Sequence, residues 1–296
     1  MSFPGNGFEL LGGLAALASA ASWALTSVMF GELGEEVPPE GMNLAKCLMG
    51  SAMLAAAVPL AGSGPVDGKA AAYLVCSGLL GIAAGDTFYF RALVHLGPRL
   101  TVLLGSLGPV FTVLLAVLLL GERPGPAAWA GIVLVTAGAA WVMWERSPDG
   151  RARDRRKGVK YALLAAACMS VSIILAKIGV ASCPALESAL VRMAGAGAGL
   201  LLWGAARGRF GDWLEPLKSA RLLRRLAAAV FITMFGGFYL ALFSLKHAPA
   251  AVASTLNSTT PLFIVPLSAL MLKERITARA AGAALLAAAG VVLIFL

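Results

Sequence analysis

Residues 104–123 read LGSLGPVFTVLLAVLLLGER, and residues 256–275, which follow 152 positions later, read LNSTTPLFIVPLSALMLKER. Ten of the twenty aligned pairs are identical, and they include Pro109 with Pro261 and the Glu-Arg pair that ends each stretch. Shared leucines would arise by chance in an apolar chain, but proline, phenylalanine and Glu-Arg in one register would not. Self-similarity at a fixed offset indicates an internal duplication, so we expect two related halves.

The composition indicates that lipid surrounds most of the chain. Of the 296 residues, 59% are hydrophobic and only 13% are charged, and the mean hydropathy is +0.84. This balance differs from that of soluble domains. A helix needs about 20 apolar residues to cross the hydrocarbon core. Apolar windows of that length fall at 8–30, 41–61, 70–93, 98–121, 124–145, 158–179, 184–206, 222–246, 249–272 and 276–296. We therefore expect an all-α membrane protein with ten transmembrane helices.

One long polar stretch, ERSPDGRARDRRKGVK at 145–160, divides the chain almost equally. We expect a first five-helix repeat over 1–145, a basic linker over 146–157 and a second five-helix repeat over 158–296. Because five is odd, the second repeat enters the membrane in the opposite sense to the first. Inverted repeats are the architecture of many secondary transporters, whose binding sites lie near the midplane where the repeats meet.

The charges and motifs exclude several other classes of protein. The net charge of +9 comes from bases that lie between apolar windows, so membrane lipid is a better partner for them than nucleic acid. The four cysteines have no CxxC spacing, which indicates packing rather than a metal centre. HExxH, GxSxG and Walker-type motifs are missing from the sequence. We therefore expect no enzyme activity, no cofactor and no bound metal.

Two five-helix repeats, each closing its fourth helix with a proline-centred apolar run and a Glu-Arg pair, resemble the drug/metabolite transporter superfamily. Within it, the chain is similar to the EamA-type ten-helix carriers over its whole length. The resemblance implies a multi-pass protein of the plasma or inner membrane that carries a small solute by alternating access, often as an exporter of amino acids or other metabolites. It fixes no substrate, because members of the family move very different molecules.

Two basic residues lie inside apolar windows, Lys46 in the second and Arg192 in the seventh. A cation at such a depth is costly unless it reaches the interface, finds a partner or faces water. The two residues occupy equivalent places in the two halves and match the basic position of the EamA-type carriers in these helices. Either they attract the anionic group of a substrate, or they snorkel to an interface or pair with a carboxylate.

Asp86 and Arg91 lie in the third window, in the stretch GDTFYFRALVHLG. An intramembrane carboxylate is by default a functional candidate, either as a proton site or as a counter-ion for a buried base. A separation of five residues places Asp86 and Arg91 about 140° apart around a helix, so we expect Asp86 to face another helix. The repeat sets Phe238 opposite Asp86, so this polarity belongs to one half only.

Pro109 and Pro261 fall in the middle of the fourth and ninth windows. Each removes a backbone hydrogen bond and frees the carbonyl four residues earlier, on Gly105 or Asn257. We interpret the prolines as hinges beside a solute site; the alternative is a kink that only shapes packing. The candidate solute-binding residues are Trp23, Lys46, Asp86, Tyr89, Arg91, Ser106, Arg192, Phe238, Asn257 and Ser258.

The expected function is a secondary transporter for a small polar solute, an amino acid or a related metabolite. A proton is the candidate coupling ion, since no nucleotide-binding motif is present. The alternatives are a flippase for a lipid-linked head group and a membrane assembly subunit. Basic residues number 17 on the side opposite the termini and 4 on the side of the termini, which predicts termini outside. The resemblance implies that both termini are cytoplasmic, and the sequence leaves the oligomeric state open.

Overall fold

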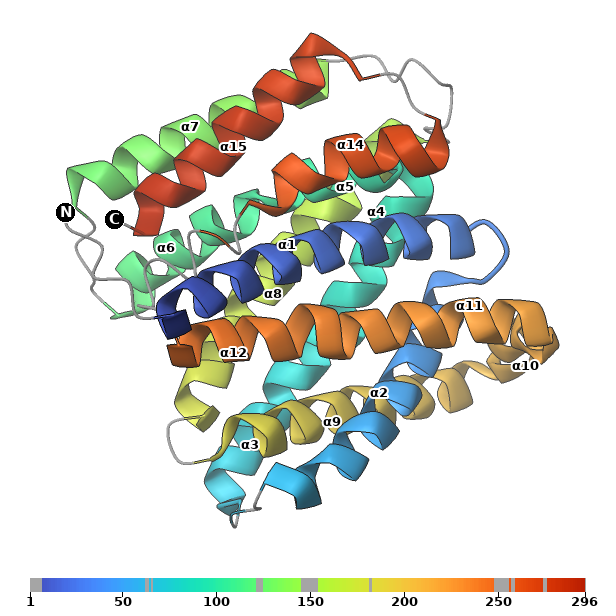
Figure 1. Cartoon of the computed structure of the whole chain (residues 1–296). Coiled ribbons are helices and arrows are strands. Elements are labelled where there is room, and N and C mark those ends of the chain that lie inside the picture. Colours follow the sequence, from blue (N-terminus) through green and yellow to red (C-terminus); the bar gives the residue numbers. More distant parts are fainter. Residues whose placement is uncertain are drawn as a thin grey trace.

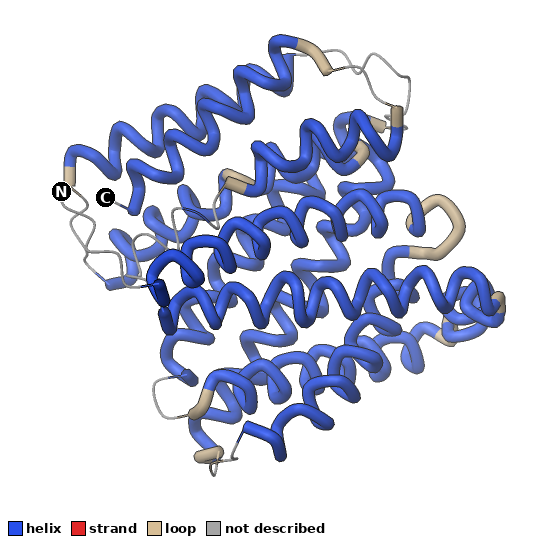
Figure 2. The backbone as a smooth tube through the Cα atoms, viewed as in Figure 1, coloured by secondary structure: helices blue, strands red, loops and turns tan. Residues whose placement is uncertain are grey.

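Helices make up nearly all of the described backbone, and most of them lie side by side along one common direction (Figure 1; Figure 2). The structure is a computed structural model and describes residues 7–61, 64, 66–120, 125–144, 154–180, 183–247, 256, 259–273 and 276–295. No strand occurs within these ranges.

The first half of the chain contains α1 (Gly7–Leu33), α2 (Pro39–Ala61), α3 (Gly68–Ser77), η1 (Gly78–Asp86), α4 (Thr87–Leu96), α5 (Pro98–Gly105), α6 (Leu107–Leu120) and α7 (Pro126–Trp144). The segment η1 is π-helical, and it joins α3 and α4 into one continuous rod. Asp67 caps the start of this rod by accepting hydrogen bonds from the backbone N–H groups of Lys69 and Ala70.

The second half contains α8 (Arg155–Val180), α9 (Ala185–Arg207), α10 (Phe210–Leu214), the 3-10 turn η2 (Glu215–Lys218), α11 (Ala220–Phe231), η3 (Ile232–Tyr239), α12 (Leu240–His247), α14 (Thr260–Leu272) and α15 (Ala278–Phe295). The segment η3 is also π-helical and joins α11 to α12. At the end of α9, Gly208 adopts a left-handed conformation that terminates the helix.

Six helical segments of the described chain are long and apolar enough to cross a membrane: Leu10–Leu33, Pro39–Pro59, Gly68–Leu96, Arg155–Ala176, Leu186–Arg207 and Ala220–Tyr239. They coincide with six of the ten predicted windows. The other four windows hold the shorter helices α5 to α7, α14 and α15, so ten spans are not established. Integral membrane location follows from the six apolar helices, and exposed leucines such as Leu118 and Leu202 suit contact with lipid.

The predicted window 98–121 is not one helix, because the backbone breaks at Ser106 between α5 and α6. We predicted that Pro109 lies in mid-helix, but it lies in the first turn of α6. Pro261 likewise lies in the first turn of α14. A proline in the first helical turn loses no hydrogen bond, since the N–H groups of that turn have no partner within the helix.

Equivalent helices of the two halves pack against each other. Helix α2 contacts α9, and α7 contacts α15. The first helix of each half packs on the π-interrupted rod of the other half, so α1 contacts η3 and α12 while α8 contacts η1 and α4. In Figure 1, α7 and α15 form one pair at the edge of the bundle, next to α14. The internal duplication is therefore also visible in the packing.

Small residues allow the closest of these approaches. A Cβ atom added at Gly78 would lie 2.1 Å from the carbonyl oxygen of Arg192, and one at Gly290 would lie 2.7 Å from the backbone nitrogen of Val135. Neither contact can be relieved by rotating a side chain, because the atoms that would be met belong to the backbone. Glycine at such crossings lets membrane helices approach closely.

We expect the substitution Gly78→Ala to destabilise the protein by about 1–3 kcal/mol, because the new methyl group must push α9 away from η1. Thermal unfolding in detergent would measure the change. Gly68→Ala is the matched control, since nothing lies within 4 Å of a Cβ atom at Gly68. Equal stability of the two variants would contradict the packing argument.

Candidate functional site

The π-helical segments η1 and η3 occupy overlapping positions in the two halves. Under the offset of 152 residues, Gly78–Asp86 corresponds to residues 230–238, and η3 covers Ile232–Tyr239. A π-helical turn contains an extra residue and disturbs the regular hydrogen bonds of the rod. Such turns are frequent at functional sites, and here each lies in the middle of a long rod.

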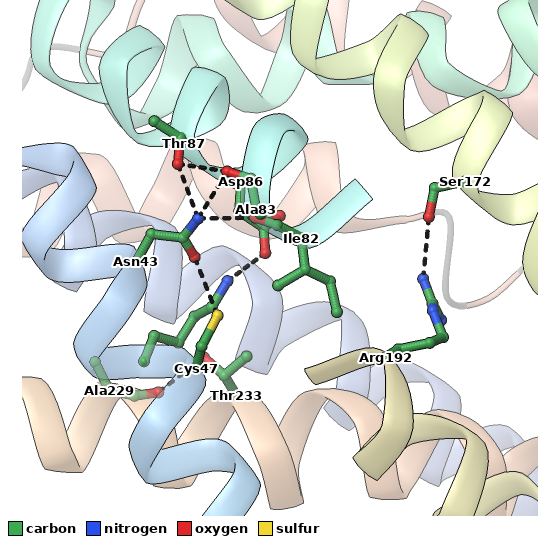
Figure 3. A network of polar contacts seen from close by, with 11 residues as sticks. Asn43, Cys47, Ile82, Ala83, Asp86, Thr87, Ser172, Arg192, Ala229 and Thr233 are labelled. Carbon is green, nitrogen blue, oxygen red and sulfur yellow. Dashed lines mark hydrogen bonds and ion pairs between the residues drawn. The ribbon is translucent and has the colours of Figure 1, made fainter. Parts of the chain in front are cut away.

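Asn43 of α2 satisfies the carbonyl groups of η1. Its side-chain nitrogen donates to the carbonyl oxygens of Ile82 at 2.8 Å and Ala83 at 3.2 Å, and to the hydroxyl oxygen of Thr87 at 2.9 Å (Figure 3). The side chain is fully buried. Asn43 therefore joins α2 to the π-helical segment at the level of Asp86. The sequence analysis missed it, although an amide in an apolar helix three residues before Lys46 was a usable signal.

Lys46 and Asp86 form an ion pair between α2 and the end of η1. The lysine side chain is only 5% exposed and the aspartate side chain 22% exposed, so the carboxylate is the more accessible partner. The Lys46 ammonium group also lies 5.2 Å from the centre of the Phe90 ring. Of the partners left open for Asp86, the structure selects Lys46. The pair is neutral as a whole, which limits the cost of burying two charges.

Arg192 of α9 approaches the same region from the second half. One of its terminal nitrogens donates to the hydroxyl of Ser172 at 3.3 Å, while its Nε atom is buried without a hydrogen-bond partner in the described structure (Figure 3). The Ser172 hydroxyl itself donates to the carbonyl of Ser77 at 2.7 Å. No carboxylate of the described chain lies within ion-pair distance of Arg192. Asp86 acts on its charge only at longer range, since the ion pair of Asp86 is with Lys46.

Aromatic residues from both halves form another part of the wall. Trp23 of α1 meets the edge of Phe238 in η3, with ring centres 5.0 Å apart. Tyr89 of α4 shares a hydrogen bond of 2.7 Å with the hydroxyl of Ser27. The Ser27 hydroxyl donates to the carbonyl of Trp23 within α1, so its bond with Tyr89 is the contact that joins α1 to α4 at this level.

These groups surround a central cavity of about 480 Å³ that is lined by helices of both halves. Its wall is mainly apolar, with few charged groups. The cavity brings together eight of the predicted residues: Trp23, Lys46, Asp86, Tyr89, Ser106, Arg192, Phe238 and Pro261. A volume of this size and a few convergent polar groups are typical of small-molecule sites.

The remaining predicted residues are not part of this described wall. Arg91 points elsewhere and pairs with Glu40, because five residues separate it from Asp86 along the rod. Asn257 and Ser258 lie outside the described residues. Only the backbone of Pro109 is described, in the first turn of α6.

The cavity also contains polar residues that the sequence analysis did not select. Ser172 of α8 and Thr233 of η3 line it, and both are buried. Serine and threonine occur throughout the apolar windows of this chain, so residue type alone did not distinguish them.

Comparisons with known proteins point to one family. A model described as the EamA-like transporter family matches residues 10–144 and, a second time, residues 156–296. An uncharacterized transporter from Archaeoglobus fulgidus is 25% identical over 270 residues, which cover 90% of this chain and 91% of that protein. A solved structure, described only as the crystal structure of a protein, has a TM-score of 0.62 and 20% identity and covers 97% of this chain and 95% of its own. This last likeness concerns the fold alone.

The ion pair gives a test of the site's construction. Asp86→Asn leaves Lys46 buried without a counter-charge, so we expect it to lower the free energy of unfolding by on the order of 3 kcal/mol. The double variant Lys46→Met/Asp86→Asn contains no charge at this point and should regain most of that loss. Unfolding measured for both single variants and the double variant completes the cycle. Additive losses would show that the two side chains do not stabilise each other.

Proposed function

The chain belongs to the EamA-like transporter family, and on this premise we propose that it is a secondary transporter that moves a small polar solute across the membrane by alternating access. In this proposal ten transmembrane helices form two inverted five-helix repeats over residues 1–145 and 158–296, joined by the basic linker 146–157. The solute binds in the central cavity, and the two repeats close around it in turn.

The observation that carries the proposal is the excess of positive charge in a cavity between the two halves, where Lys46 and Arg192 face a single carboxylate, Asp86, among the described lining residues. Lys46 and Asp86 cancel one another, so one positive charge remains for a ligand. A guanidinium group presents several N–H donors in one plane, which suits a carboxylate. The site therefore favours a solute with one anionic group, such as an amino acid or a related metabolite. Trp23 and Phe238 offer an apolar surface to the rest of that solute.

In the proposal, Asp86 is the residue that binds the coupling proton. Protonation of its carboxyl group would remove the counter-charge of Lys46, and the cavity would then contain two uncompensated cations. Binding of a proton would therefore strengthen binding of an anionic solute, and by linkage the solute would strengthen binding of the proton. The partial exposure of the Asp86 side chain to the cavity is consistent with this role.

In the proposal, ion pairs between the two halves hold one end of the cavity closed. Arg225 of α11 pairs with Glu32 at the end of α1 and lies 3.7 Å from a carboxylate oxygen of Glu36. In the proposal these pairs break when this end opens. The helix break at Ser106 and the π-helical segments then supply places where the rods bend, and Pro109 and Pro261 mark the first turns of helices that would swing as the hinges proposed from the sequence.

Transport by purified protein in liposomes tests the solute site. With a panel of anionic, zwitterionic and cationic metabolites, we expect the preferred solute to contain an anionic group. Arg192→Gln should raise the KM for that solute by about tenfold or more, since a charge-assisted hydrogen bond contributes about 1.5–3 kcal/mol. Arg192→Lys should restore part of the affinity. Arg156→Gln, an exposed change at the start of α8, is the control. An unchanged KM in correctly folded Arg192→Gln would remove Arg192 from the site.

The pH dependence of uptake tests the role of Asp86. For the wild-type protein we expect the affinity for an anionic solute to rise as the pH falls, because protonation of Asp86 frees the charge of Lys46. The double variant Lys46→Met/Asp86→Asn should bind the solute with an affinity that no longer varies with pH. Asp154→Asn removes a carboxylate outside the cavity and should keep the wild-type profile. A wild-type profile in the double variant would exclude Asp86 as the proton site.

A further inference from the structure

A second hollow, of about 350 Å³, lies away from the central cavity. Segments α2, α4, α9 and α10 contribute to it, at the end of the bundle where α9 finishes and α10 begins (Figure 1). It shares no lining residue with the central cavity. The solute route proposed above therefore makes no use of it.

The side chains that line this hollow have a net positive charge. Three guanidinium groups, those of Arg91, Arg207 and Arg209, face two carboxylates, those of Glu40 and Asp212. Arg91 pairs with Glu40, and Arg209 lies 3.3 Å from Asp212. Within the described chain no carboxylate is at ion-pair distance from Arg207. One guanidinium group is therefore free, and the exposed pair of Arg209 is weak enough to exchange for a stronger partner.

The position of the hollow corresponds to the head-group level of a membrane. The candidate span of α9 ends at Arg207, and the candidate span of α2 starts at Pro39, next to Glu40. Trp203 and Trp213 lie against each other in its wall, with ring centres 5.3 Å apart. Tryptophan is enriched at membrane–water interfaces, where its ring is apolar and its N–H group is polar. The wall thus combines interfacial aromatics with basic side chains.

An apolar surface adjoins the hollow on its membrane side. Leu202 is 72% exposed and Trp203 37% exposed, and both precede Arg207 on α9 by about one turn. A ligand with a phosphate group and acyl chains would cover both surfaces at once. A soluble phosphate would use the arginines only and would leave the leucine and the tryptophan in contact with other lipid.

We propose that this hollow is a binding site for an anionic phospholipid, with Arg207 and Arg209 on the phosphate oxygens and Trp203 beside the upper part of the acyl chains. Basic pockets between membrane helices recognise anionic head groups in this way. Arginine suits a phosphate because its fork donates two parallel hydrogen bonds. The site is independent of the transport site, so a failure of either proposal leaves the other intact.

The segment from α9 to α11 allows a matched control for the test. Besides Arg207 and Arg209 it contains Arg221 and Arg224, which are exposed and do not line the hollow. The variants Arg207→Gln/Arg209→Gln and Arg221→Gln/Arg224→Gln lose the same charge from the same stretch of chain. All four side chains are exposed, so both variants should fold. A difference between the two variants isolates the hollow from the general attraction of basic residues to anionic lipid.

The experiment is native mass spectrometry of the detergent-solubilised full chain with phosphatidylglycerol or phosphatidylcholine. We expect the wild-type protein and Arg221→Gln/Arg224→Gln to bind one phosphatidylglycerol at least about fivefold more tightly than phosphatidylcholine. Arg207→Gln/Arg209→Gln should lose this preference. No preference in the wild-type protein, or an equal loss in both variants, would overturn the proposal. Displacement of the lipid by millimolar inorganic phosphate would also overturn it, because the ligand would then be a soluble phosphate.

Discussion

Burial of charge among apolar helices is the constraint on which the rest of this structure depends. A charge in such surroundings needs a partner, and Lys46 obtains one from Asp86. That pair joins α2 to η1, and Asn43 strengthens the same junction by satisfying the carbonyl groups of the π-helical turn. Asp86 pairs with Lys46, and Arg192 of the second half has no ion-pair partner within the described chain. This ion pair thus joins two helices of the first half and, in the proposal, leaves one positive charge in the cavity for a ligand.

The duplication explains the shape of the cavity, and the residues that differ between the two halves explain its polarity. Both halves contribute a π-interrupted rod, and each rod packs against the first helix of the other half. At the position of Asp86, however, the second half has Phe238, which meets Trp23 instead of a base. The cavity is therefore polar on one wall and aromatic on another. An amphipathic small molecule is better suited to such a pair of walls than a fully hydrated ion.

The sequence predicted the helical class, the duplicated family and eight of the residues that line the cavity, because intramembrane charges and repeated prolines are rare enough to be informative. It left the partner of Asp86 open, since helix periodicity excludes Arg91 but does not choose between bases on other helices. It also missed the break at Ser106, which separates α5 from α6 three residues before Pro109. Asn43 was missed although an amide in an apolar helix is a usable signal, because its role depends on a π-helical turn that the residue pattern does not predict. Ten spans remain a proposal, with six long apolar helices described.

The central claim is that the cavity between the halves is the solute route and opens to each side in turn. Cys47, Cys76, Cys168 and Cys183 are first replaced by alanine. A single cysteine is then placed at position 106, because Ser106 lines the cavity. The account predicts that impermeant thiol reagents label this cysteine from either side of the membrane, and that the transported solute slows labelling. Labelling from one side only, unchanged by any solute that the protein transports, would contradict it.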